Sequence, residues 1–441
     1  MLNKKVLLIF FFAFLIRLIA LNQSLWLDEA VTANVVKNFD FAQIISKFSP
    51  TDFHPPLYYI FMKVWTNIFG YSEIALRMPS VLFSLMTGYV VYLIGGIWAA
   101  VFFLFNPLIV YYSQEARMYM MVTFLLTAAL YFFISNKKNQ IYFNLFILLS
   151  LLTFYGSAFL VAAFLLYFLY KKQYKNLFIS SFALFIYFLI ISPLLYQQLI
   201  NSKIVLANVT NWSVTLGKAN IKNLLLIPIK FSIGRISFFP KWLYWGIAGG
   251  WTTFVLYQIL NIKNQNDKFK IKNINLLCYL LIFPLLVGFL VSFFMPMLQY
   301  FRFLYLIPIV CLLLGFRLSS QSTSDLRGQI LAGGFIIFSL TYLLISQFHR
   351  EDWKNLVKNL PKDKPVYMIT ASSDPIKYYD ENLKINELRI TDYEFNEKEI
   401  VIIPYAAEIY GFDYKSILNK SGYQQKKEVS FREITYEQWI K

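Results

Sequence analysis

Apolar segments long enough to cross a lipid bilayer recur from the start of the chain to residue 347. A transmembrane helix needs about 20 mainly apolar residues. Eleven candidate segments lie at 6–22, 77–95, 96–112, 119–135, 141–155, 157–170, 176–195, 241–260, 274–294, 300–316 and 330–347. Composition agrees, because 58% of the residues are hydrophobic and 15% are charged, against about a quarter charged in soluble domains. We therefore expect a mainly α-helical, polytopic membrane protein with about 11 transmembrane helices.

The net charge of +17 is distributed unevenly along the chain. Residues 1–348 hold 26 Lys and Arg against 8 Asp and Glu, whereas residues 349–441 are nearly neutral. Basic residues are densest in the short linkers, at 136–140, 171–175, 261–273 and 317–329. Such linkers are typically cytoplasmic. We expect a multi-pass plasma-membrane protein with a cytoplasmic N-terminus and an extracytoplasmic C-terminal segment, and we expect no nucleic-acid partner.

The few acidic residues of the membrane part indicate where chemistry takes place. With this orientation six of the eight lie on the outer face, namely Asp28, Glu29, Asp40, Asp52, Glu73 and Glu115. None falls in the middle of an apolar segment, where ion-coupled transporters usually place ionisable groups. The sequence therefore favours a site at the outer membrane surface.

Two regions outside the apolar segments have recognisable organisation. The first outer loop, 22–76, contains amphipathic stretches at 26–39 and 56–69, and both are typical of helices lying in the membrane interface. In the C-terminal region, 366–370 and 400–403 are predicted to be strands, and 374–380 and 406–418 are predicted to be helices. This alternation indicates a small α/β domain.

Asp28 and Glu29 form an acidic pair about six residues beyond the first apolar segment. A carboxylate in this position can deprotonate an acceptor, and its neighbour can orient it or hold a metal. Acidic residues also stabilise the first turn of a helix through its dipole. The residues alone leave both interpretations open.

Asp52 and His54 lie two residues apart in the same loop, and two prolines follow. One histidine with one or two carboxylates can bind a divalent cation weakly. A lone histidine is more often structural. The pair is therefore a tentative metal site, with Mg, Mn or Zn as the candidate cofactor.

Three arginines enter the outer leaflet beside aromatic residues: Arg77, Arg117 and Arg302. Guanidinium groups bind phosphate oxygens in bidentate fashion, so the set is suited to a lipid phosphate. Arginines also snorkel at helix ends without binding anything. A fourth, Arg17, lies deeper in the first apolar segment, and we expect it either to snorkel or to find a carboxylate partner.

Several motifs together resemble the polytopic glycosyltransferases of the C-type fold, the family of protein O-mannosyltransferases and aminoarabinose transferases (glycosyltransferase family 39-like). The resemblance is strongest over residues 1–135 and rests on topology beyond them. Its motifs are Arg17-Leu18, Trp26-Leu27-Asp28-Glu29-Ala30, His54-Pro55-Pro56-Leu57-Tyr58-Tyr59, Leu76-Arg77-Met78-Pro79-Ser80 and Ser113-Gln114-Glu115-Ala116-Arg117-Met118-Tyr119. Weaker similarities are Tyr300-Phe301-Arg302 and Glu351-Asp352-Trp353-Lys354.

The resemblance implies an enzyme that moves a sugar from a polyprenyl-phosphate donor to a protein, lipid or glycan acceptor outside the cytoplasm. Residues 1–348 would form the transmembrane glycosyltransferase domain, with its catalytic loop at 22–76, and 349–441 a small extracytoplasmic α/β domain. Asp28 would be the catalytic carboxylate, with Glu29 supporting it. The implied substrate- and phosphate-binding residues are Arg77, Glu115, Arg117, Tyr119 and Arg302, and His54 and Asp52 are the tentative metal ligands.

Two other functions fit parts of the sequence. A flippase or exporter of lipid-linked glycans would use the same lipid and the same arginines, but it would not need Asp28 and Glu29. A non-catalytic membrane scaffold would leave the outer acids and the loop arginines unexplained. We therefore expect a transferase, with the flippase as the alternative.

Overall fold

The computed structural model describes residues 4–134, 139–209, 211–260, 268–318, 325–389 and 397–441. The N-terminal half contains α1 (Lys4–Leu18), α2 (Leu27–Asn38), α3 (Phe41–Gln43), the π-helical turn η1 (Ile44–Phe48), α4 (Leu57–Phe69), α5 (Glu73–Leu104), α6 (Pro107–Ser113), α7 (Tyr119–Ile134), α8 (Gln140–Thr153), η3 (Tyr155–Ser157), α9 (Ala158–Tyr170) and α10 (Tyr174–Asn208). The remaining helices of the bundle are α11 (Trp212–Leu216), α12 (Ile221–Ile233), α13 (Lys241–Leu260), α14 (Lys268–Val291), η4 (Tyr300–Leu306), α15 (Ile307–Leu318), α16 (Leu326–Leu344) and η5 (Ser346–Phe348).

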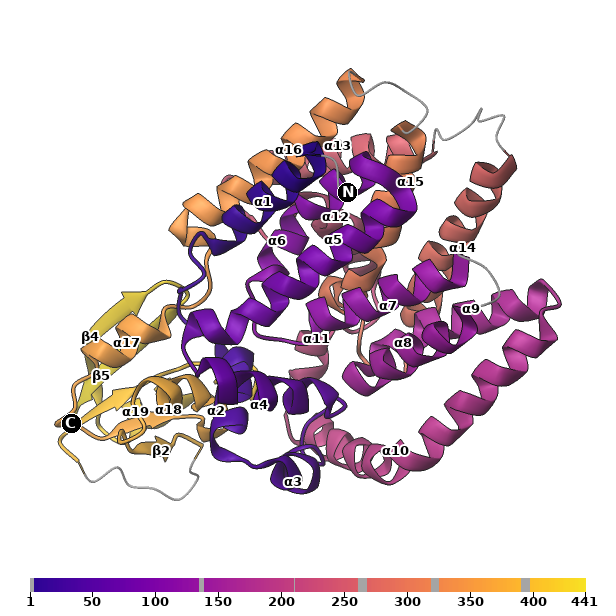
Figure 1. The fold of residues 1–441 in the computed structure, drawn as a ribbon. Coiled ribbons are helices and arrows are strands. Elements are labelled where there is room, and N and C mark those ends of the chain that lie inside the picture. The colour runs from indigo at the N-terminus through magenta and orange to yellow at the C-terminus, as the bar shows by residue number, and fades with distance from the viewer. Residues whose placement is uncertain (1–3, 135–138, 210, 261–267, 319–324, 390–396) are drawn as a thin grey trace.

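The fold is mainly helical, as predicted (Figure 1). Among the described residues, five helical stretches are long and apolar enough to cross a membrane: Glu73–Leu104, Tyr174–Asn208, Asn273–Val291, Tyr300–Leu318 and Leu326–Leu344. Three shorter apolar stretches are Tyr119–Ile134, Gln140–Thr153 and Tyr155–Tyr170. The total of 11 spans stays a prediction. Much of the predicted linkers 136–140, 261–273 and 317–329 lies outside the described residues.

Helix α5 turns back on itself at Gly96, where φ is 76° and only glycine is comfortable. After the turn, Leu104 packs against Gly88, so closely that a Cβ on Gly88 would lie 2.5 Å from the leucine side chain. The two legs are therefore antiparallel neighbours. The predicted division of this region into segments 77–95 and 96–112 agrees with the turn.

Arg17 of α1 spans the two legs of this hairpin. It is fully buried, and it donates hydrogen bonds to the Ser84 hydroxyl at 2.8 Å and to the Leu104 carbonyl at 2.9 Å. A third bond, of 2.7 Å, goes to the Ala13 carbonyl. Of the two expectations for Arg17, neither holds, because its partners are a hydroxyl and carbonyls rather than water or a carboxylate.

The amphipathic stretches of the first loop form α2 and α4, within one residue of the predicted bounds. Two prolines immediately precede α4, and Gly70 with φ of 83° ends it. Proline is favoured at the start of a helix and glycine just beyond its end. Both helices lie on the side of the bundle where the C-terminal segment packs (Figure 1). We call this side the sheet end of the bundle.

The C-terminal segment is built on a five-stranded mixed sheet with the order β2-β1-β3-β5-β4. Its elements are α17 (Trp353–Asn359), β1 (Val366–Met368), η6 (Thr370–Ser372), α18 (Asp374–Tyr379), β2 (Ile385–Glu387), β3 (Glu399–Ile402), α19 (Tyr414–Lys420), β4 (Gln424–Phe431) and β5 (Ile434–Ile440). Strands β1, β2 and β3 are parallel, and β5 runs antiparallel to both β3 and β4. The boundary at 348/349 remains a prediction.

The predicted strands at 366–370 and 400–403 and the helix at 374–380 correspond to β1, β3 and α18. The helix predicted at 406–418 is wrong over its first half, because α19 begins only at Tyr414. Ala406 and Gly411 both adopt positive φ there, which breaks a helix. The hairpin of β4 and β5 is not predicted from the sequence. The first residues of β4 are all polar and exposed, so they lack the alternation of apolar and polar residues that indicates a strand.

Candidate functional site

Glu29 and Arg77 form a buried ion pair at the sheet end of the bundle. Both are 0% exposed, and Arg77 binds the carboxylate through Nε to Oε1 at 2.8 Å and Nη2 to Oε2 at 2.6 Å. Oε1 also accepts a 2.7 Å hydrogen bond from the backbone N–H of Ala116. The other three N–H groups of Arg77 go to the carbonyls of the 21–24 turn, at Leu21, Gln23 and Ser24.

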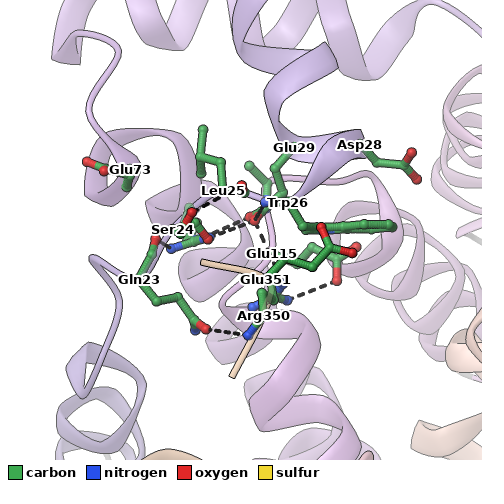
Figure 2. Close-up of polar contacts among 12 residues, drawn as sticks. Gln23, Ser24, Leu25, Trp26, Asp28, Glu29, Glu73, Glu115, Arg350 and Glu351 are labelled. Atoms are coloured by element: carbon green, nitrogen blue, oxygen red, sulfur yellow. Dashed lines mark hydrogen bonds and ion pairs between the residues drawn. The ribbon is translucent and has the colours of Figure 1, made fainter. Parts of the chain in front are cut away.

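Arg350 and Glu115 extend this pair into a cluster of four buried charges. Arg350 Nη2 lies 2.9 Å from Glu115 Oε2, and its Nε lies 3.7 Å from Glu29 Oε2 (Figure 2). Burial by itself would raise the pKa of Glu29, but Arg77 and Arg350 hold it below its ordinary value. For Glu115, burial raises the pKa and the charge of Arg350 only partly offsets this. The cluster ties the loops at 24–29 and 114–117 to the start of the C-terminal segment.

This geometry changes the predicted roles of three residues. All five N–H groups of Arg77 are used by the protein, so none is left for a substrate phosphate. Glu29 is enclosed by two arginines and a backbone N–H, and Glu115 is 1% exposed against Arg350. The structure therefore places Glu29, Arg77 and Glu115 in a buried supporting frame, and their predicted catalytic and phosphate-binding roles stay predictions.

Asp28, the sequence neighbour of Glu29, faces the opposite way. Its side chain is 36% exposed, and Figure 2 shows its carboxylate pointing away from the cluster around Arg350. Arg117 Nη2 lies 3.5 Å from Asp28 Oδ2, and Arg117 Nη1 donates to the Tyr59 hydroxyl at 3.3 Å. Burial would lower the pKa of Arg117, but Asp28 and nearby tyrosines hold it well above its ordinary value. Asp28 is thus an accessible carboxylate beside a fixed positive charge.

Asp52 and His54 form a second pair near Arg117, whose charge acts on Asp52. His54 Nδ1 is 3.4 Å from Asp52 Oδ1, and the second carboxylate oxygen of Asp52 is buried without a hydrogen-bond partner in the described part of the chain. Burial would raise the pKa of Asp52, but His54 and Arg117 keep it low. Gln198 of α10 holds this loop by donating to the carbonyls of Ser49 and His54, at 2.7 and 3.0 Å.

We tested whether this pair fits the expected divalent cation. Catalytic zinc uses three protein ligands. Across the residues that the structure describes, no three His, Cys, Asp or Glu side chains gather closely enough to hold a metal. The unpaired oxygen of Asp52 is one free donor atom, and His54 is the only other ligand beside it. The described residues therefore do not supply the three protein ligands of a catalytic zinc site.

Arg302 and Tyr119 lie close enough to Asp28 for its charge to act on both. The half-buried Arg302 donates one hydrogen bond, of 3.2 Å, to the Pro296 carbonyl. Within the described ranges, no carboxylate lies within 4.0 Å of its guanidinium. The Tyr119 ring packs against Phe301, the neighbour of Arg302, with 5.6 Å between centroids. Arg302 therefore keeps several N–H groups that an anion can use.

A second basic group was missed from the sequence: Lys230, Arg235 and Lys241. Lys230 donates to the Tyr244 hydroxyl at 3.1 Å, and Arg235 donates to the Tyr111 hydroxyl at 2.7 Å. None of the three has a carboxylate within 4.0 Å in the part of the chain that the structure describes. Burial lowers the pKa of Lys230 to about 8, and Arg235 and Lys241 add to this. Three cations that repel one another without a carboxylate partner indicate an anion site.

Arg235 reaches solvent even though its partner Tyr111 and the adjoining Tyr112 are buried. An apolar groove of about 270 Å³ lies next to this basic group, between α12, α13, α14, α15 and α16. Phe231, which follows Lys230 in the chain, lines the groove together with Val255, Leu281 and Phe335. The apolar groove and the basic group thus share helix α12, through the neighbouring residues Lys230 and Phe231.

The C-terminal segment contributes Glu351 and Tyr405 to the same region. Glu351 accepts hydrogen bonds from Trp353 Nε1 at 2.9 Å and from the Tyr405 hydroxyl at 3.0 Å. Burial raises the pKa of Tyr405, and the negative charges of Glu351 and Asp28 add to this. The contact between Glu351 and Tyr405 could not be predicted from the sequence, because 54 residues separate them.

No protein-family model matches the chain, and no curated protein matches it. Two crystal structures of ArnT from Cupriavidus metallidurans do match in shape. The apo structure gives a TM-score of 0.59 at 12% identity, covering 98% of this chain and 97% of that one. The structure bound to undecaprenyl phosphate gives 0.56 at 12% identity, covering 98% of both chains. The chain therefore has the C-type fold of polytopic membrane glycosyltransferases, as the sequence resemblance implied.

Proposed function

We propose that the protein is an integral-membrane glycosyltransferase. It transfers a sugar from a polyprenyl-phosphate-linked donor to a hydroxyl or amine of a protein, lipid or glycan acceptor. The observation that carries this proposal is the accessible carboxylate of Asp28, held 3.5 Å from Arg117 and within electrostatic reach of Arg302. A carboxylate beside cations that lack carboxylate partners suits proton removal next to a departing phosphate.

The donor fits the apolar groove and the basic group next to it. A prenyl chain would lie between α12 and α16, where the lining is apolar. Its phosphate would then meet Lys230 and Arg235 first, with Arg302 close by because η4 packs against α12. The crystal structure of ArnT with undecaprenyl phosphate supports this class of donor, since that protein shares the fold and binds such a lipid.

The reaction needs only one proton transfer and one displacement. The acceptor oxygen or nitrogen attacks the anomeric carbon, and the bond between that carbon and the phosphate oxygen breaks. The electron pair of the broken bond stays on the phosphate, and the proton of the acceptor goes to Asp28. The cations around the phosphate stabilise the charge that develops on it. No nucleotide-binding domain is required, because the lipid phosphate is already the leaving group.

The buried frame positions Asp28 for this role. Glu29 is fixed by Arg77 and Arg350, so the first turn of α2 cannot rotate without breaking the cluster. Arg117 belongs to the same 114–117 loop whose backbone donates to Glu29. The frame therefore sets the 3.5 Å separation between Asp28 and Arg117. Glu29 and Arg77 act here as positioning residues.

We assign the sheet end of the bundle to the extracytoplasmic face of the plasma membrane. The support is the distribution of charge in the sequence, because the linkers predicted to be cytoplasmic are the ones densest in basic residues. On this assignment the C-terminal segment and Asp28 both face the outside, where a lipid-linked sugar meets its acceptor.

The proposal is tested with purified protein and a panel of synthetic polyprenyl-phosphate sugars. We expect release of sugar and formation of polyprenyl phosphate from at least one donor, slowly onto water and faster onto an acceptor. Donors that bind without any turnover would instead support the flippase or exporter, which needs the lipid but no bond cleavage.

A further inference from the structure

A cleft of about 540 Å³ opens between α2 of the first loop and α18 of the C-terminal segment. Ligand sites commonly measure about 300–1,000 Å³. Asn34, Asn38, Phe39, Phe48, Asp374 and Lys377 are among the residues that line it. We propose that this cleft binds the acceptor and that the acceptor is a glycan. This inference rests on the proposed transferase function and adds the chemical class of the acceptor.

The floor of the cleft belongs to the same face of α2 as the proposed catalytic carboxylate. Val31, Val35 and Asn38 line the cleft, and they lie three, seven and ten residues beyond Asp28. At 3.6 residues per turn these positions share one side of the helix. With a rise of 1.5 Å per residue, the floor extends from about 5 to about 15 Å beyond Asp28. A chain of sugars lying along α2 would thus point one end at Asp28.

One wall of the cleft is connected directly to the site. The Phe48 ring packs edge-on against Tyr59, with 4.8 Å between centroids. Tyr59 in turn accepts a hydrogen bond from Arg117, which lies beside Asp28. The opposite wall is fixed to α2 as well, because the Asn34 amide donates to the backbone carbonyl and side chain of Asp374, at 3.0 and 2.8 Å.

The lining is chemically suited to sugar hydroxyls. It mixes amides, which both donate to and accept from hydroxyls, and carboxylates, which accept from them, with the partly exposed rings of Phe39 and Phe48. Apolar bodies with a few placed polar groups are the usual composition of a ligand site. The exposed Asn38 has no side-chain hydrogen bond among the described residues, so its amide is available.

The charge of the cleft argues against an anionic lipid headgroup. Lys377 lines the cleft together with the carboxylates of Asp374 and Glu381. Glu381 is also paired with Lys37. The cleft therefore has no excess of positive charge for a phosphate. The cations without carboxylate partners lie instead around Lys230 and Arg302, where we place the donor.

The test uses the full-length protein in detergent and three neutral probes: chitotetraose, maltotetraose and mannotetraose. Binding of each is measured by titration calorimetry without donor, so that it does not depend on catalysis. The variant Asn38→Trp fills the cleft. Asn382→Trp places the same side chain on an equally exposed asparagine outside the lining, and it is the matched control. Donor hydrolysis in the absence of acceptor is recorded for all three proteins.

We expect saturable binding of at least one oligosaccharide, weakened about tenfold by Asn38→Trp, which corresponds to about 1.4 kcal/mol, and unchanged by Asn382→Trp. Donor hydrolysis should be equal in all three proteins, because Asn38 is remote from the phosphate site. If none of the probes binds, or if Asn38→Trp binds like the wild type, the glycan assignment is overturned. Binding of a serine- and threonine-rich peptide to the wild type, lost in Asn38→Trp, would also overturn it. Wild-type protein that binds a glycan but never cleaves a donor would contradict the transferase instead.

Discussion

Asp28 and Glu29 are adjacent in sequence, yet their carboxylates have opposite environments. Glu29 is 0% exposed and bound by Arg77 at 2.6 and 2.8 Å, whereas Asp28 is 36% exposed, with Arg117 at 3.5 Å. Consecutive helical residues point about 100° apart, so one acid can face the core while the other faces the site. The pair thus combines a fixed anchor and an accessible carboxylate in a single turn of α2.

The ion pair between Glu29 and Arg77 should contribute measurably to the stability of the protein. Arg77→Met leaves the carboxylate of Glu29 buried without its closest arginine partner. Removing one partner of a buried ion pair typically lowers the free energy of unfolding by about 3–5 kcal/mol. We expect a lower midpoint of thermal unfolding in detergent, recovered in part by the double variant Arg77→Met/Glu29→Leu. Arg327→Met, on an exposed arginine, is the control. An unchanged midpoint for Arg77→Met would show that the cluster does not stabilise the fold.

Arg302 should affect catalysis rather than folding. Arg302→Gln removes a cation that has no carboxylate partner in the described part of the chain, so no buried acid is left uncompensated. We expect kcat for sugar transfer to fall about 10²-fold, the size typical for one lost donor to a developing anion. Arg302→Lys should recover part of this loss. Equal activity of the glutamine variant and the wild type would remove Arg302 from the phosphate site.

We expect kcat/KM for the donor to depend on pH through Lys230. With its pKa at about 8, the amine is charged below that pH and neutral above it. Attraction for the donor phosphate should therefore decline as the pH rises through 8, and kcat/KM for the donor reports this free-enzyme pKa. Lys230→Arg should abolish the decline, because arginine stays charged, whereas Lys230→Gln should lower kcat/KM across the whole range. A profile for Lys230→Arg identical to that of the wild type would contradict the assignment.

Chelation tests the geometry at Asp52 and His54. Because the described residues do not supply three metal ligands, we expect dialysis against EDTA to leave donor hydrolysis unchanged. His54→Ala should then alter activity only modestly, through the position of Asp52. Loss of activity on chelation, restored by one divalent cation, would show that a metal is held there with ligands from the substrate or from water.

The sequence was a good guide wherever local chemistry decides the structure. Apolar length predicted the helical bundle, the amphipathic stretches at 26–39 and 56–69 predicted α2 and α4, and the division at 95/96 coincides with the turn of α5 at Gly96. Each of these signals acts on its own few residues through backbone geometry or burial. The fold class followed because several such signals agreed with one another.

The pairing of charges could not be predicted in this way. Glu29 meets Arg77 from 48 residues away and Arg350 from more than 300, and nothing local distinguishes an arginine bound to a carboxylate from one free for a phosphate. The sequence therefore predicts Arg77 as a phosphate ligand, whereas in the structure its five N–H groups all have partners within the protein. Lys230 was overlooked for the opposite reason, because it lies within an apolar stretch and reveals its role only beside Arg235 and the groove.

The most direct measurement compares sugar transfer by wild-type protein and by Asp28→Asn, with Asp40→Asn as the control. Asp40 lies in the same loop and caps α3 through a carboxylate oxygen that asparagine can replace. We expect Asp28→Asn to keep its thermal midpoint and its affinity for the donor but to lose acceptor transfer by at least about 10²-fold, the lower end of the contribution of a general base. The Asp40 variant should remain active. An active Asp28→Asn protein would contradict the catalytic role of Asp28, because among the described residues it is the one carboxylate within 4.0 Å of Arg117.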